Sequence, residues 1–202
     1  LQPVSLIAVS PLVLAVPMGA PTGKAFFDQA KVQGDKLNYG TPGVGTVAHL
    51  GMELLKAKAG IAPVHVPYPG NPQVITGLIG GQVQMALLPP GLAMAQVRGG
   101  KLQAVGLTSA GRSSVVPEVP SLADAGVQGL QLEIWNAVAA PNSLPKAHVQ
   151  KLAQPEERGK VAGVGGLPVP RHRLGVVPGY LASVVQPGQQ PLGNDVSLVG
   201  FV

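Results

Sequence analysis

The sequence predicts an α/β protein in which helices cover a mostly parallel sheet, and two observations carry this prediction. Between residues 17 and 109, apolar runs typical of buried strands alternate with helical segments at the spacing of β-α-β units. The chain also holds 28 glycines and 21 prolines among its 202 residues, without the period of collagen. We therefore expect many short elements joined by tight turns.

The first elements are strands followed by a helix. Val4–Val16 is apolar and rich in β-branched residues, and Pro11 interrupts it, so two short strands are expected. Thr22 is a residue type that caps helices, and it precedes the amphipathic segment Gly23–Val32. The residues expected on the buried side of this helix are Phe26, Phe27 and Ala30.

The second β-α unit contains the most informative loop of the chain. A brief strand over Leu37–Tyr39 enters the glycine-rich segment Gly40–Thr46, and a helix then runs to Lys58 before Gly60 ends it. The apolar stripe expected along this helix consists of Val47, Leu50 and Leu54.

The following units repeat the pattern. Asn71 as an N-cap with Pro72 at the first helical position predicts a helix start, and glycine pairs end this helix and the next. The remaining expected elements are strands over Pro63–Tyr68, Val83–Leu88 and Leu102–Thr108, and a helix over Pro90–Val97.

After Thr108 the periodicity changes. Residues 109–120 form a polar connector with prolines, which is typical of a passage between lobes, and one helical turn is expected over Ser121–Ala125. Leu130–Ala140 is strand-like, and a helix is expected from Pro145 to Leu152. Residues 153–202 show no sustained period, so we expect a divergent, disordered tail.

Composition excludes several classes of protein. The chain has no cysteine, which excludes disulfides, thiolate metal sites and cysteine nucleophiles. Aromatic residues make up only 3%, and the basic residues behind the net charge of +5 are scattered, so a nucleic-acid partner is not expected. The most apolar stretch, Leu6–Val16, is too short to span a bilayer.

The segment Gly40–Thr46 predicts an anion site. A glycine-rich loop that enters a helix presents free backbone N–H groups and the positive end of the helix dipole. The hydroxyls of Thr41 and Thr46 add further donors where a carboxylate could lie. The alternative is a plain strand-to-helix turn that needs glycine for its backbone angles.

Chemistry beyond binding has little support in the sequence. Gly43, Gly45 and Ala48 match the dinucleotide pattern G-x-G-x-x-A, but no acidic residue for a ribose follows at the end of the next strand. His49 and His65 lack a carboxylate at metal-site spacing and are expected to be hydrogen-bonded packing residues. We expect no catalytic residue, cofactor or metal.

Two aromatic residues are further candidates for a binding cleft. Tyr68 lies in a stiff Pro-Tyr-Pro-Gly turn after a core strand, and its hydroxyl could face a cleft or the ring could simply pack. Trp135, the single tryptophan, could likewise face a cleft or fill the core.

Taken together, the motifs resemble a known family. Segments that carry the likeness are Leu37–Tyr39, Gly43–Thr46 with His49 and Leu50, Val64–Tyr68, Leu78–Val83, Gly100–Leu102, Thr108 with Ser109 and Arg112, Pro117–Pro120, Ala125 with Gly126, Trp135 and Ala140 with Pro141. Their order over residues 1–152 resembles the periplasmic solute-binding receptors of tripartite tricarboxylate transporters, the Bug family.

The resemblance implies a two-lobed, periplasmic-binding-protein-like fold that closes over a small carboxylate: a dicarboxylate, a tricarboxylate or an amino acid. It implies a periplasmic, non-enzymatic monomer that serves membrane transporter subunits. Ligand contacts carried over to this chain are Thr41, Gly43, Val44, Gly45, Thr46, Tyr68 and Trp135. The expected parts are a strand remnant of the first lobe (1–16), the second lobe (17–109), a return segment (110–152) and the tail (153–202).

The chain departs from the family pattern in three places. The family's N-terminal strand, loop and helix and its secretion signal are absent, which implies an incomplete first lobe and a truncated remnant with weakened binding. Leu87–Pro90 stands where the family has an acidic or amide residue, and the tail does not resemble the family's closing helices. Two alternatives stay open: an NAD(P)-binding oxidoreductase domain, and a ligand-loaded partner of a sensor protein.

Overall fold

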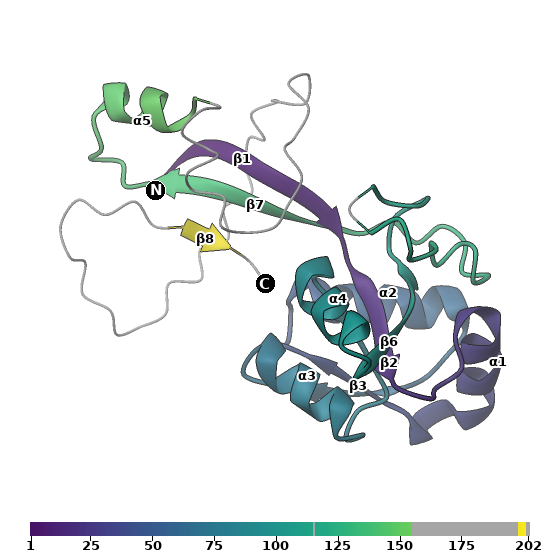
Figure 1. The fold of residues 1–202 in the computed structure, drawn as a ribbon. Helices are drawn as coiled ribbons and strands as arrows, with labels where there is room; N and C mark the ends of the chain where they lie inside the picture. The colour runs from purple at the N-terminus through teal and green to yellow at the C-terminus, as the bar shows by residue number, and fades with distance from the viewer. Residues whose placement is uncertain (115, 155–197, 201–202) are drawn as a thin grey trace. The chain divides into compact units, whose positions relative to one another are not determined.

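The computed structural model describes residues 1–114, 116–154 and 198–200, and these form two compact units (Figure 1). The larger unit holds Ser10–Ile134, and the smaller one holds Leu1–Val9 with the described residues from Trp135 onward. Among the described residues, the larger unit contains a sheet with several helices and the smaller one a sheet with one helix, so the predicted α/β class is confirmed.

The larger unit contains most of the regular structure. Its strands are β2 (Val13–Pro17), β3 (Asn38–Thr41), β4 (Val64–Pro67), β5 (Met85–Leu88) and β6 (Leu102–Leu107). Its helices are α1 (Gly23–Gln33), the 3₁₀ turn η1 (Gly34–Lys36), α2 (Val47–Ala59), α3 (Asn71–Ile79) and α4 (Pro90–Arg98). Each predicted element between residues 13 and 108 is present, with ends that differ by a few residues.

The five strands form one sheet in the order β4-β3-β5-β2-β6. β3 pairs in parallel with β4, where Tyr39 lies opposite His65, and in parallel with β5. β2 is antiparallel to both β5 and β6, so it runs against the other four strands. The predicted mostly parallel sheet is confirmed, with one reversed strand inside it.

Both faces of the sheet are buried. Along β2 and the residue before it, Leu12, Leu14 and Val16 pack on the face covered by α1 and α2, whereas Val13 and Ala15 pack on the face covered by α3 and α4 (Figure 1). This alternation follows from the two-residue repeat of a strand. Helices on both faces explain why the central strands read as continuous apolar runs.

The predicted apolar stripe of α2 is confirmed at Val47, which is partly buried against the core, and was wrong at Leu50 and Leu54. Leu50 is 58% exposed and Leu54 is 36% exposed. The residues that face the sheet are Ala48, Gly51, Met52, Leu55 and Ala59. A Cβ on Gly51 would lie 2.8 Å from Cδ1 of Leu87, so the absence of a side chain there lets the helix approach closely.

Two predicted helix caps differ in detail. Thr22 occupies the N-cap of α1, but its side chain makes no capping hydrogen bond. Gly70, not Asn71, is the N-cap of α3; Asn71 is the first helical residue and is buried. The segment expected as one helical turn, Ser121–Ala125, begins with a bridge to Leu107 and continues as turns.

The smaller unit contains the remaining elements. β1 (Gln2–Pro11), β7 (Glu133–Ala140) and β8 (Leu198–Gly200) form a three-stranded sheet, and α5 spans Lys146–Leu152. β7 and β8 are antiparallel. Gln2 donates from its side chain to the carbonyl oxygen of Pro141 at 2.9 Å, which ties β1 to the chain after β7.

The unit boundaries differ from the predicted ones. Residues 10–16, expected in the first lobe, belong to the larger unit because β2 pairs with β5 and β6. Residues 110–134, expected in the return segment, belong there as well. Most of the expected tail lies outside the described residues, and within it the sequence missed β8.

Candidate functional site

The candidate site is the loop between β3 and α2. Its backbone requires glycine at two positions, because φ is 144° at Gly43 and 81° at Gly45. Residues other than glycine rarely adopt such φ angles. The loop therefore has a fixed turn that delivers the chain into the first turn of α2.

Both threonine hydroxyls predicted as ligand donors are engaged within the loop. Thr41 is fully buried, and its Oγ1 lies 2.6 Å from Nε2 of His65 and 3.2 Å from the carbonyl oxygen of Gly43. Thr46 is the N-cap of α2: its hydroxyl donates to the same carbonyl at 2.8 Å and accepts from the N–H of His49 at 3.3 Å. These hydroxyls hold the loop in shape.

The first backbone amides of α2 remain available. The N–H of Leu50 is the first to bond back to the loop carbonyls, at 3.0 Å from the oxygen of Thr46. Within the described part of the chain, the N–H groups of Val47 and Ala48 have no acceptor. Such amides at the positive end of a helix dipole favour a negatively charged group.

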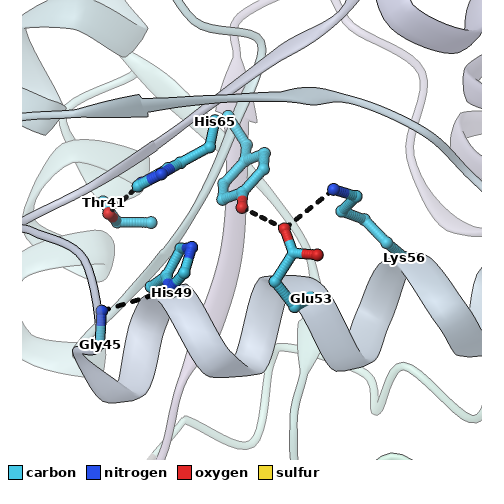
Figure 2. A network of polar contacts seen from close by, with 7 residues as sticks. Thr41, Gly45, His49, Glu53, Lys56 and His65 are labelled. Atoms are coloured by element: carbon cyan, nitrogen blue, oxygen red, sulfur yellow. Dashed lines mark hydrogen bonds and ion pairs between the residues drawn. The ribbon is translucent and has the colours of Figure 1, made fainter.

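Two imidazole rings contact the loop, that of His49 from α2 and that of His65 from β4 (Figure 2). His49 and His65 have their ring centroids 4.4 Å apart, and the ring of Tyr39 lies 4.9 Å from that of His65. The N–H of Gly45 donates to Nδ1 of His49 at 3.2 Å. The prediction that both histidines are hydrogen-bonded packing residues is confirmed.

A charged pair completes the network. The hydroxyl of Tyr39 donates to Oε1 of Glu53, which also accepts from Nζ of Lys56 at 2.8 Å (Figure 2). The hydrogen bond from Lys56 has the largest effect and that from Tyr39 the next largest, and together they hold the pKa of Glu53 below its usual value. Burial, and then the bond to Glu53, raises the pKa of Tyr39 well above its usual range. Burial and then the charge of His49 lower the pKa of His65.

The structure brings together only some of the predicted contacts. Thr41, Gly43, Val44, Gly45 and Thr46 form one loop, and the Val44 side chain is 75% exposed at its tip. Tyr68 follows β4, and its hydroxyl lies beside Gly77 of α3 and 3.4 Å from Oε1 of Gln82. Trp135 belongs to the smaller unit and is 44% exposed.

Sequence reasoning missed the network behind the loop. Tyr39, Glu53 and Lys56 were not singled out, although Glu53 lies four residues after His49 and therefore on the same side of α2. The alternation of β3 likewise puts Tyr39 and Thr41 on one face. These spacings were a usable signal.

The described residues offer neither a metal centre nor a membrane-spanning helix. Among them, no group of three or more histidine, aspartate or glutamate side chains is arranged to hold a metal ion. In the same part of the chain, no helix combines the length and the apolar character needed to cross a membrane.

Comparison with known proteins decides the family. Residues 1–160 match the model of the tripartite tricarboxylate transporter family receptor. The chain belongs to this family. The family is one of receptors, so the oxidoreductase alternative is not favoured.

Individual relatives agree with this assignment. A UPF0065 protein of Bordetella pertussis is 32% identical over 154 residues, which are 75% of this chain and 48% of that protein. The solved structure of Rpa4515 of R. palustris with adipate has a TM-score of 0.71 and 29% identity, over 75% of this chain and 51% of that one. MatC from Rhodopseudomonas palustris, with bound malate, has a TM-score of 0.67 and 29% identity, over 75% of this chain and 52% of that one. The chain thus spans about half the length of these relatives.

Proposed function

We propose that this chain is a solute-binding receptor that captures a small carboxylate at the head of α2 and delivers it to the membrane subunits of a tripartite tricarboxylate transporter. In this proposal it works in the periplasm as a monomer and catalyses no reaction. The observation that carries the proposal is the pair of free amides at Val47 and Ala48, in a loop whose shape is fixed by hydrogen bonds.

The chemistry of the loop suits a carboxylate. Two N–H groups at a helix start offer donors to carboxylate oxygens, and the helix dipole adds a partial positive charge. The nearest cation of the network, Lys56, already pairs with Glu53. Binding would therefore depend on backbone donors, and the exposed side chain of Val44 would supply an apolar contact to the ligand.

Relatives indicate the size of the solute. Two family structures hold adipate and malate, which are short dicarboxylates. We extend this class to the present chain.

The proposal is tested by titration calorimetry with malate and adipate, using two variants at one position. Val47→Pro removes one of the free amides at the first helical position, where proline is well tolerated. Thr46, the residue before it, already has φ −68° and ψ 160°, which suits a following proline. Val47→Ala is the matched control, because it trims the side chain and keeps the N–H.

We expect saturable binding of at least one dicarboxylate by the wild type and by Val47→Ala. Affinity should fall about tenfold in Val47→Pro, which corresponds to the loss of one hydrogen bond to a charged group. Absence of saturable binding for both acids, or equal affinity of the two variants, would contradict the proposal.

A further inference from the structure

A cavity lies in the larger unit, between α1 and one edge of the sheet. Its volume is about 300 Å³, which is within the range of small-molecule sites. All residues that line it belong to the larger unit. They come from α1, from the end of β2 and the turn after it, and from the positions just before β3 and β5.

This cavity is separate from the candidate loop. β3 and β5 are parallel, and Leu37 and Gln84 come immediately before them, so the cavity lies at the edge where these strands begin. The loop between β3 and α2 leaves the opposite end of β3, about 13 Å farther along the strand. A ligand in the cavity would therefore not occupy the head of α2.

Hydrogen bonds hold two walls of the cavity in place. The side-chain amide of Gln84 accepts from the N–H of Asn38 and donates to the carbonyl oxygen of Gly81, both at 2.8 Å. In the turn after β2, the N–H of Gly19 donates to Oε1 of Gln103 at 3.1 Å. These bonds fix the walls without a ligand, and small-molecule sites are usually preformed in this way.

The buried part of the lining is apolar. Phe26, Ala30 and Leu37 line the cavity, and each is buried. Among the described residues around the cavity, none that lines it is charged. A charged ligand would lose hydration there without an opposite charge to replace it, whereas a ring would pack on Phe26. The lining therefore selects an uncharged, largely apolar compound.

Two glutamines on α1 provide the polar groups of the cavity. Gln29 and Gln33 are four residues apart, so they project from the same side of the helix. Both line the cavity, and neither side chain makes a hydrogen bond within the described part of the chain. Each side-chain amide offers N–H donors and an acceptor oxygen. A ligand with an amide of its own would match both kinds of group.

We propose that this cavity is a second binding site, which takes a small uncharged ring compound that carries an amide group. The ring packs on Phe26 and Leu37, and the amide bonds the side chains of Gln29 and Gln33. This inference does not depend on the proposed function, because the cavity shares no residue with the head of α2.

The experiment is an amide NMR titration of the 202-residue chain with benzamide, and with benzoate, which has the same shape and carries a charge. We expect benzamide to bind with a Kd of about 0.1–10 mM, the affinity that so few atoms supply. Its saturable shifts should centre on the side-chain amides of Gln29 and Gln33 and on the backbone N–H of Leu37, while Val47 and Ala48 stay unmoved. Benzoate should cause no saturable shift at the cavity.

A double variant tests the role of the glutamines. Gln29→Met with Gln33→Met removes both free amides and keeps the side-chain length and the helix propensity. Its affinity for benzamide should fall about three- to tenfold, as expected for lost hydrogen bonds between neutral groups. The matched control is Gln73→Met with Gln96→Met on α3 and α4, which cover the other face of the sheet. This control should bind benzamide as the wild type does.

No saturable shift at the cavity with benzamide would show that the cavity holds only solvent, and would overturn the inference. Equal affinity for benzoate at the cavity would overturn it as well, because the absence of charge would then select nothing. Full benzamide affinity in the double variant would do the same for the two amides. Carboxylate binding at the head of α2 is decided by the malate and adipate titrations, so the two proposals can fail independently.

Discussion

Oγ1 of Thr41 lies 2.6 Å from Nε2 of His65 at a position that solvent does not reach. This bond joins the end of β3 to the neighbouring edge strand β4, immediately before the candidate loop begins. Because Thr41 also bonds Gly43, the hydroxyl links the sheet to the loop.

Replacing this hydroxyl should destabilise the larger unit. Thr41→Val keeps the shape of the side chain but leaves polar partners unpaired, so we expect a loss of about 1–3 kcal/mol in the free energy of unfolding. Urea denaturation measures it. Thr41→Ser, which keeps the hydroxyl, should lose clearly less unfolding free energy. An equal loss in both variants would show that the methyl group of Thr41, and not its hydrogen bond to His65, stabilises the unit.

The N-cap of α2 provides a second prediction with an internal control. Thr46 caps the helix with its side chain, so Thr46→Ala should cost about 1 kcal/mol in unfolding free energy. Thr22 occupies the same position on α1 without such a bond. Thr22→Ala should therefore change stability by less than about 0.5 kcal/mol. A similar loss at both positions in denaturation experiments would contradict the assigned cap.

How far the sequence predicted these features depends on the range of the interactions. The loop Gly40–Thr46 and the helix after it were predictable, because glycine, the threonine cap and the helix start are local signals. The buried face of α2 was not, since the close approach at Gly51 involves Leu87 of β5, which is distant in the sequence. Apolar spacing alone favoured the side with Leu50 and Leu54, which is exposed.

The boundaries between the two units were also not predictable from local sequence. Residues 10–16 read as strand from their own composition, but their place in the sheet depends on pairing with β5 and β6, far along the chain. The resemblance of motifs identified the family without resolving such pairings. The roles of Tyr68 and Trp135 at a ligand stay predictions.

Gly77 is a position where the structure predicts a strong response. A Cβ there would lie 2.9 Å from Cζ of Tyr68, and the ring is held between α3 and Gly40. Gly77→Ala should therefore cost about 1–3 kcal/mol by overpacking, in spite of the better helix propensity of alanine. Gly91→Ala on α4, which meets nothing within 4 Å, is the control and should be neutral or stabilising by up to about 1 kcal/mol. Thermal unfolding that ranks the two variants in the opposite order would contradict the packing of Tyr68.

Glu53 should contribute to the pH dependence of stability. Its pKa is lowered in the folded protein, so its contribution is present above the unfolded value of about 4.3 and is lost as pH falls through the folded value. At neutral pH, Glu53→Gln should be less stable by a few tenths to about 1 kcal/mol, because the carboxylate is half exposed to solvent. Unfolding experiments should show this gap closing below about pH 4; a gap that widens on acidification would contradict the assignment.

Amide NMR with added malate or adipate tests the central claim most directly, because it reports on the backbone donors themselves. The account predicts saturable shifts centred on the N–H groups of Val47 and Ala48, with smaller changes along the rest of α2. Saturable shifts that leave these two amides unmoved would place the ligand elsewhere and contradict it.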